Sequence, residues 1–208
     1  MGVALVITLH FVPYGDRAML ALIDHLQPED RSLVLHYLQQ RNDLEDVYLA
    51  EQHVLVMPFN QAFPATHSIA PATQIIFPPC QHTIILRWNG EDLEQACARL
   101  GHNARTLAQL YMQPIYQVSF LGFRPGFAYL RGLPQALQLP RRELIRPRVA
   151  GGTFAAGGPY VAIYPDDSPG GWWLLAQTVG VELFRAHPPR QGALFQHGDE
   201  IIFREATP

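Results

Sequence analysis

Glycine, proline and aromatic residues crowd the stretch from Ser119 to Trp173, and this feature constrains the fold of the chain more than any other. Glycine and proline at this density fix backbone turns that most residues cannot adopt, and they interrupt helices. Short strands joined by tight turns are the structure that such a pattern favours. We therefore expect an all-β barrel or sandwich from residue 115 onward, with its clearest strands at 115–121, 159–164, 172–178, 181–184 and 200–204.

The first 79 residues show a different pattern. A proline followed by two acidic residues at 28–30 is typical of a helix start, and an apolar stripe at helical spacing follows it. The segment 18–24 fits a strand or a helix equally well. Strands are expected at 3–11, 47–49 and 53–57, the last two forming a hairpin. These elements predict a small α/β sandwich, which ends in a connector with five prolines and a short strand at 74–77.

Two helices are expected early in the second half, after a strand at 82–88. The first covers 89–101, with Asn89 as its cap and Gly101 as its terminator, and the second covers 104–112 with Asn103 as its cap. The sequence therefore predicts an α+β chain of two domains, residues 1–79 and residues 80–208.

Composition excludes several classes of function. The net charge of -3 gives no general attraction to nucleic acid or to an anionic membrane. All 15 basic residues are arginine, so that a Schiff-base lysine and a P-loop lysine are excluded. The nine histidines lack the spacings of metal ligands, and no metal site is expected. Two cysteines without CxxC spacing, and an apolar start too short to span a bilayer, predict a cytoplasmic protein.

Four arginines lie within eight residues, at positions 141, 142, 146 and 148. Their positive charges repel one another, and locally only the carboxylate of Glu143 offsets those charges. Because arginine binds carboxylates and phosphates through two parallel hydrogen bonds, this cluster favours an anion-accepting cleft over a solvated loop. The glycine-rich segment 150–158 lacks the GK[ST] of a P-loop. It fits either a pair of tight β turns or bulges, or a run of backbone amides that face an anionic oxygen. The nearby aromatic residues fill a barrel core or line a pocket.

Four motifs occur in a fixed order: GFxPGFxYLxGL at 122–133, PRR at 140–142, PR at 147–148 and IYPxxSPGGW at 163–172. This order resembles the family of the 5-oxoprolinase B subunit, also called KipI-like or allophanate hydrolase subunit 1-like. The resemblance implies a small N-terminal α/β domain followed by a C-terminal cyclophilin-like β-barrel. It also implies membership of a complex that uses ATP to open 5-oxoproline to glutamate, in which an oxoprolinase C-type and an A-type companion take part.

The resemblance also gives roles to particular residues. Tyr111 stands where members usually have a histidine, Thr153 replaces a serine, and Gln177 replaces an arginine. These three are the candidate catalytic residues, although the chain has lost an acid/base group and an oxyanion partner. The arginines are expected to hold a carboxylate or phosphate, with Thr153 and the glycine amides as oxyanion donors. The candidate substrate-binding residues are Phe123, Phe127, Tyr129, Arg141, Arg142, Arg148, Gly151, Gly152 and Tyr164.

Three hypotheses about function stay open. The first is a component of an ATP-dependent enzyme acting on a cyclic or urea-derived amide, inactive by itself. The second is a non-catalytic regulator, because some members of the family inhibit a sensor histidine kinase. The third is a small-molecule sensor without chemistry. The intact turn motifs and arginines favour the first.

Overall fold

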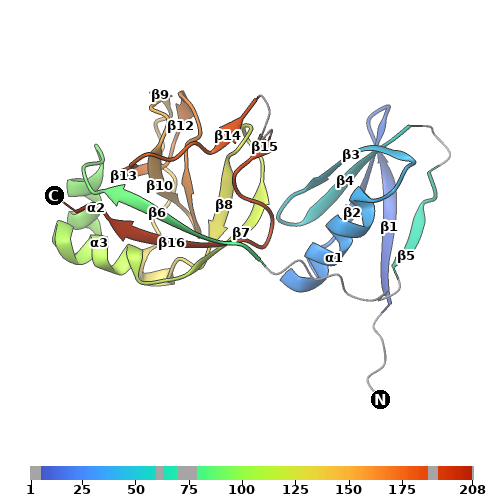
Figure 1. The fold of residues 1–208 in the computed structure, drawn as a ribbon, viewed down its shortest axis with the longest axis horizontal. Coiled ribbons are helices and arrows are strands. Elements are labelled where there is room, and N and C mark those ends of the chain that lie inside the picture. Colours follow the sequence, from blue (N-terminus) through green and yellow to red (C-terminus); the bar gives the residue numbers. More distant parts are fainter. Residues whose placement is uncertain (1–5, 60–62, 70–78, 187–191, 208) are drawn as a thin grey trace, which may run out of the picture. The chain divides into compact units, whose positions relative to one another are not determined.

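The structure, a computed structural model, describes residues 6–59, 63–69, 79–186 and 192–207. The chain divides into two compact units, residues 1–78 and residues 79–208 (Figure 1). Among the described residues, no helix combines the length and the apolar character needed to cross a membrane.

In its described residues, the N-terminal unit is a five-stranded antiparallel sheet with one helix. Its strands lie in the order β3-β4-β2-β1-β5. The elements are β1 (Ile7–Tyr14), β2 (Ala18–Leu22), α1 (Pro28–Gln39), β3 (Leu44–Leu49), β4 (His53–Pro58) and β5 (Thr66–Ile69).

The core of this unit follows from the periodicity of its elements. In β1 the buried residues Ile7, Leu9 and Phe11 alternate with exposed ones, so that one face of the strand packs inward. Val34 and Leu38 of α1 pack into the same cluster. The helix start at residue 28 and the β3–β4 hairpin are confirmed, and the ambiguous segment 18–24 contains the strand β2. The strand expected at 74–77 lies outside the described residues.

The second unit is built around a closed barrel of seven strands, in the order β10-β11-β8-β7-β16-β6-β13. A mixed α+β fold with a barrel is therefore confirmed. The barrel strands are β6 (Gln81–Arg87), β7 (Tyr116–Leu121), β8 (Ala128–Arg131), β10 (Thr153–Gly157), β11 (Tyr160–Ile163), β13 (Trp173–Thr178) and β16 (Glu200–Glu205).

Shorter elements surround this barrel. Two helices follow β6, and two small two-stranded sheets pair β9 with β12 and β14 with β15. Where a strand was expected at 181–184, the structure has only a two-residue strand that begins at Phe184. The elements are α2 (Leu93–Leu100), α3 (Ala104–Met112), the 3-10 turn η1 (Gln135–Leu137), β9 (Arg146–Val149), β12 (Ser168–Gly170), β14 (Phe184–Arg185) and β15 (Gly192–Ala193).

Of the three residues predicted to begin or end the helices α2 and α3, the structure confirms two, Asn103 and Gly101. The Asn103 side chain accepts a hydrogen bond from the backbone N–H of Thr106 at 2.9 Å, and Gly101 ends α2 with φ +71°. The prediction that Asn89 caps α2 is wrong, since the helix begins at Leu93. Its approach segment instead bonds to β13, through the backbone N–H of Gly90 and of Asp92.

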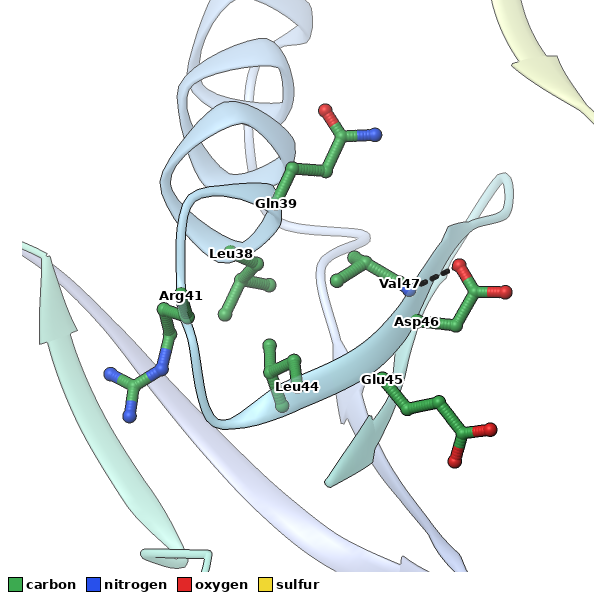
Figure 2. Close-up of a pocket in the computed structure, with 7 residues that line it drawn as sticks. All are labelled: Leu38, Gln39, Arg41, Leu44, Glu45, Asp46 and Val47. Carbon is green, nitrogen blue, oxygen red and sulfur yellow. Dashed lines mark hydrogen bonds between the residues drawn. The ribbon is translucent and has the colours of Figure 1, made fainter. Parts of the chain in front are cut away.

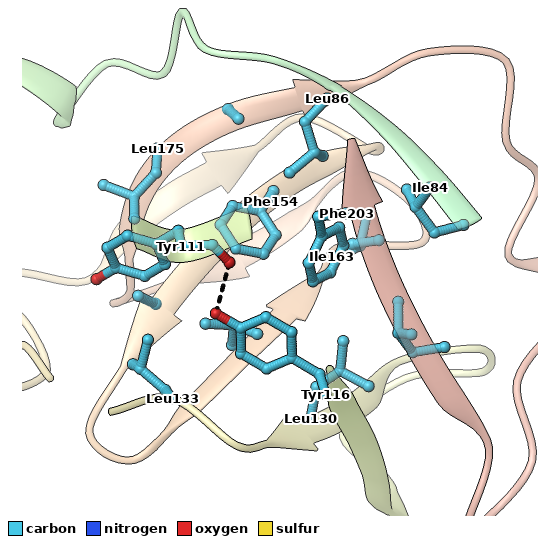
Figure 3. Packing of buried hydrophobic residues seen from close by; sticks show 14 of the residues in the cluster. Ile84, Leu86, Tyr111, Tyr116, Leu130, Leu133, Phe154, Ile163, Leu175 and Phe203 are labelled. Atoms are coloured by element: carbon cyan, nitrogen blue, oxygen red, sulfur yellow. Dashed lines mark hydrogen bonds between the residues drawn. The ribbon is translucent and has the colours of Figure 1, made fainter. Parts of the chain in front are cut away.

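Large side chains fill the inside of the barrel (Figure 3). Phe154, Phe203 and Tyr116 are fully buried there. Tyr111 enters from α3, and its backbone carbonyl accepts a hydrogen bond from the Tyr116 hydroxyl at 2.8 Å. Strands β10, β11 and β13 place alternate residues on their other face, and those residues belong to a second cluster described below.

Candidate functional site

The second cluster contains most of the predicted aromatic residues. Phe127, Tyr164 and Trp172 are buried in it, and Tyr129 packs against it half-buried. The Phe127 ring lies 5.4 Å from Tyr164 and 5.8 Å from Trp172, between ring centres. Burial raises the pKa of Tyr164 to about 12, so that its phenol is neutral at physiological pH. These rings therefore form a core beneath the loops, which is one of the two alternatives that the sequence left open. The substrate-binding role of Phe127, Tyr129 and Tyr164 stays a prediction.

Phe123 is the exception among these aromatic residues, because 57% of it is exposed. It is the one non-glycine residue with a positive φ, +68°, in the described part of the chain. Such a backbone costs about 1–3 kcal/mol and persists only where the surroundings enforce it. Backbone hydrogen bonds close the turn around it, since the N–H of Arg124 donates to the Gly122 carbonyl at 2.8 Å and that of Gly122 donates to the Phe127 carbonyl at 3.1 Å. The Arg124 guanidinium also donates two hydrogen bonds to Asp166, at 2.8 and 2.5 Å.

The arginine cluster finds its counter-charge in Asp92, which is only 2% exposed. One oxygen of this carboxylate accepts hydrogen bonds from Arg142 at 2.9 Å and from Arg146 at 2.5 Å. The other oxygen accepts from the backbone N–H of Leu174 at 2.9 Å. Arg142 also lies 4.8 Å from the centre of the Trp173 ring. Arg142, predicted to hold an external anion, thus fixes the loop to the barrel through Asp92 in this structure.

The other two arginines differ from each other. Arg148, which is 78% exposed, forms an ion pair with Asp167 at 2.6 Å. The backbone N–H of Gly151 and then Arg148 lower the pKa of Asp167. Arg141 lies 5.8 Å from the centre of the Trp172 ring, and no ion pair involves it within the described ranges. Of the three predicted arginines, Arg141 is the one whose charge is left for an external anion.

The glycine-rich segment 150–158 is two tight turns around a buried strand, β10. The backbone N–H of Gly151 donates to Asp167 at 2.9 Å, and that of Gly152 donates to the Tyr164 carbonyl at 2.7 Å. Both amides therefore bond inside the protein, and the anionic oxygen that the Gly151 amide faces belongs to Asp167. A register shift between Phe154 and Ala155 adds the irregularity of a bulge.

Thr153 and Gln177 lie side by side beneath this turn. The Thr153 hydroxyl lies 2.7 Å from the Ala150 carbonyl oxygen and 3.1 Å from the Gln177 side-chain oxygen. The Gln177 amide donates to the Gly151 carbonyl at 2.7 Å. The structure thus brings together two of the three candidate catalytic residues, although their polar atoms serve the turn itself.

Tyr111, the third candidate, lies elsewhere. It is fully buried among the barrel residues, its hydroxyl donates to the Leu137 carbonyl at 2.8 Å, and burial raises its pKa. A neutral phenol without access to solvent has no route to a substrate. Tyr111 is therefore a core residue in this structure, and its catalytic role stays a prediction.

Three acidic residues were not among the predicted site residues, namely Asp92, Asp166 and Asp167. The pair at 166–167 stands inside the IYPxxSPGGW motif, which is a signal that sequence reasoning had available. Asp92 stands about 50 residues before the arginines that it binds, and no local pattern connects them. Within the described residues, no group of three or more histidine, cysteine, aspartate or glutamate side chains has the arrangement of a metal site.

Two pockets among the described residues of the N-terminal unit were not apparent from the sequence. The smaller one, of about 110 Å³, lies beside the end of α1 and the start of β3 (Figure 2). The larger one, of about 470 Å³, is in the size range of small-molecule sites. It is lined by Pro13, Gly15, Asp16, Arg17, Ala18, Met19, Pro58, Phe59 and Phe63.

Comparison with protein families and curated proteins gives consistent results. The family model described as carboxyltransferase domain, subdomain C and D, matches residues 14–194. The chain is 39% identical to the B subunit of 5-oxoprolinase from Escherichia coli O157:H7 over 115 residues, which are 55% of this chain and 51% of that protein. It is also 39% identical to the protein of the same name from Haemophilus influenzae over 114 residues, 55% of this chain and 53% of that protein. The chain thus spans about half the length of these curated relatives.

Solved structures with a similar fold include chains that are much longer than this one. The crystal structure of TTHA0988 matches with a TM-score of 0.72 and 28% identity, covering 98% of this chain and 40% of that one. The urea carboxylase of Kluyveromyces lactis matches with a TM-score of 0.63 and 15% identity, covering 96% of this chain and 22% of that one. At this identity the second match shows the fold alone.

Proposed function

The chain belongs to the carboxyltransferase domain, subdomain C and D, family as a divergent relative of the 5-oxoprolinase B subunit, and on this premise we propose that it is one component of an ATP-dependent complex that opens an amide. The match over residues 14–194 is the observation that carries the proposal. The substrate that we propose is 5-oxoproline or a related cyclic or urea-derived amide. A cytoplasmic location, a cyclophilin-like barrel and the domain limits 1–79 and 80–208 are parts of the same proposal.

We propose that this chain supplies only some of the groups that the reaction needs. Opening a lactam requires an activated carbonyl, which ATP supplies by phosphorylation, and donors that stabilise the developing negative charge. The Gly151 and Gly152 amides already bond internally, and Arg142 and Arg148 already have carboxylate partners. We therefore propose that Arg141 contacts the substrate carboxylate, and that the oxoprolinase C-type and A-type companions supply the remaining groups and the ATP site.

A reconstitution experiment tests this function. The chain is purified with the C-type and A-type companions of its host, and glutamate formation from 5-oxoproline is measured with and without ATP. We expect turnover only with all three chains and ATP. Arg141→Ala should raise KM about tenfold or more, because a hydrogen bond to a charged group is lost. Absence of turnover by the assembled complex would reject 5-oxoproline as the substrate.

The internally satisfied polar groups also favour a second candidate, a non-catalytic regulator that inhibits a sensor histidine kinase. Tyr111 is buried, and the polar atoms of Thr153 and Gln177 bond within the turn. A regulator needs a stable surface and no free acid or base. The measurement is autophosphorylation of a purified host histidine kinase at increasing concentrations of the chain. Stoichiometric inhibition, together with no turnover in the reconstituted complex, would favour this candidate.

A further inference from the structure

Three aromatic side chains lie together on the outer face of the barrel. Phe120, Tyr129 and Tyr160 come from β7, β8 and β11, which are neighbours in the barrel. The rings of Phe120 and Tyr129 stack with 4.3 Å between their centres, and the Tyr160 ring stands edge-on to both, at 5.7 and 5.8 Å. All three residues are only partly buried, so that together they form an aromatic surface that solvent reaches. We call these three residues the aromatic patch.

The alternation of side chains along the strands explains why these rings lie outside the barrel. Leu130 belongs to the barrel core, and its neighbour Tyr129 therefore points to the opposite face of β8. In β7 the register shifts between Val118 and Phe120, which places Phe120 directly opposite Tyr129. The irregularity in β7 thus brings two rings into contact on a face that the barrel core does not occupy.

Trp172 connects the aromatic patch with Arg141. Its ring lies 5.7 Å from the Tyr129 ring, between centres, and the Arg141 guanidinium carbon lies 5.8 Å from the centre of the same indole. The indole packs against Gly157, where a Cβ atom would lie 2.7 Å from the ring. Only glycine leaves room for the indole in this position, so the backbone of β10 fixes the ring that lies between Arg141 and Tyr129.

The backbone on both sides of Arg141 is held as well. The Trp173 indole N–H donates to the Pro140 carbonyl at 2.7 Å, and the N–H of Arg142 donates to the Gly171 carbonyl at 2.8 Å. Because its two neighbours in the chain are fixed, Arg141 loses little conformational entropy when its guanidinium binds a ligand.

Two hydrogen-bond donors of this region have no partner within the described ranges, the Arg141 guanidinium and the Tyr129 hydroxyl. The hydroxyl still reaches solvent, since the buried polar atoms that lack a partner do not include it. Burial raises the pKa of the Tyr129 phenol, and the nearby charge of Arg141 partly offsets this effect. The phenol is therefore a neutral donor close to a cation, and such a pair of donors suits a carboxylate.

We propose that the Arg141 guanidinium and the Tyr129 hydroxyl hold one substrate carboxylate, while Phe120 and Tyr160 form the wall against which the small flat ring that carries it lies. This inference rests on the proposed function and adds further groups of this chain to the Arg141 contact. It selects a lactam acid, such as 5-oxoproline, over neutral urea-derived amides. Tyr129 thereby determines specificity, because its hydroxyl bonds to a group that a neutral lactam lacks.

Ligand binding to the assembled complex without ATP tests the inference. The chain is combined with its C-type and A-type companions, and NMR titration gives Kd for 5-oxoproline and for 2-pyrrolidone, the same ring without the carboxylate. Tyr129→Phe should weaken 5-oxoproline binding about tenfold or more and leave the Kd of 2-pyrrolidone unchanged, because only the carboxylate loses a hydrogen bond. Phe120→Leu should weaken both ligands about fivefold, since it removes an aromatic surface.

A matched substitution in the other unit is the control. Tyr14, in the N-terminal unit, is 58% exposed, and Tyr14→Phe should leave the Kd of both ligands at the wild-type value. A Tyr129→Phe complex that loses affinity for both ligands alike would indicate a structural defect and overturn the specificity role. Unchanged binding of 5-oxoproline by Tyr129→Phe, or no binding of it by the wild-type complex, would also overturn the inference.

Failure of the proposed function gives a different result. Turnover of 5-oxoproline with the wild-type KM in the Tyr129→Phe complex would overturn the inference and keep the function. A wild-type complex that binds 5-oxoproline, loses this binding in Tyr129→Phe and yet forms no glutamate with ATP would reject the proposed reaction. In that case the carboxylate site at Arg141 and Tyr129 is still supported.

Discussion

Two arginine–aspartate groups on the second unit use the same chemistry in opposite surroundings. Asp92 is buried and binds Arg142 and Arg146, whereas Asp167 is half exposed and binds Arg148 near the surface. A buried carboxylate that loses its partners is left uncompensated in a medium of low dielectric, while an exposed one exchanges its partner for water. The comparison teaches that an arginine cluster identifies a ligand site only where solvent reaches the guanidinium groups.

Removal of the buried carboxylate is the strongest test of this comparison. Asp92→Ala leaves Arg142 without a counter-charge and the Leu174 N–H without an acceptor, and Arg146 keeps only the exposed Glu91, at 3.6 Å. We expect a loss of about 3–5 kcal/mol in the free energy of unfolding, measured by urea denaturation. A loss below about 1 kcal/mol would show that water replaces the carboxylate, and that the two groups do not differ in kind.

The buried hydroxyl of Tyr111 extends the test to an uncharged group. Tyr111→Phe removes the donor to the Leu137 carbonyl and keeps the ring. Because that carbonyl is left with an unmade hydrogen bond, we expect a loss of about 1–3 kcal/mol in the free energy of unfolding. Reconstituted turnover per folded complex should stay at the wild-type value. A drop in kcat without a change in stability would restore Tyr111 as a catalytic candidate.

In the N-terminal unit, the buried side chain of His67 lies beside Arg41. Nδ1 of His67 lies 3.3 Å from Arg41, and burial, followed by this guanidinium, lowers the pKa of His67. The unfolded chain takes up a proton near pH 6.5, whereas the folded ring resists it, so that stability falls as pH drops below about 6.5. We expect urea midpoints to decrease between about pH 7 and pH 5, and His67→Phe to reduce that decrease. The exposed His10→Gln is the control, and an equal slope in both variants would contradict the assignment.

The smallest effect is expected at the exposed ion pair. Asp167→Ala should lower the urea midpoint of the barrel only slightly at neutral pH, because water replaces most of what the Gly151 N–H and Arg148 lose. The folded-state pKa of Asp167 lies below its ordinary value, so its contribution is present above about pH 3.9 and is lost as pH falls through the lowered pKa. A midpoint that falls as far as in Asp92→Ala would erase the difference between the two groups.

Local signals explain what the sequence predicted correctly. Glycine, proline and alternating apolar residues act within a few positions, and they located the β-rich half and the strand at 115–121. Asn103 caps a helix that begins at the next residue, so its role is also a local one. The family motifs are likewise contiguous, which is why the turn framework was recognised.

Long-range pairing explains what the sequence did not predict. The repulsion within the arginine cluster pointed to an external anion, because Asp92 stands 50 residues before Arg142. The pairing of Thr153 with Gln177 spans 24 residues and depends on the β10–β13 register. Burial of Tyr111 depends on how α3 packs against the barrel strands, and a single-residue comparison with a family pattern carries no information on that packing.

Closure of the barrel has a consequence for biosynthesis. Strand β16 lies between β6 and β7 (Figure 1), and Glu200 pairs with Gln81, 119 positions earlier. Until the ribosome has made β16, strand β6 has no parallel neighbour. Both β6 and β7 then have edges whose backbone groups are unpaired. Such edges pair readily with other chains. Contacts between distant positions also slow folding. We therefore expect a nascent chain halted before residue 200 to aggregate more readily than the complete barrel, in which β16 covers both edges.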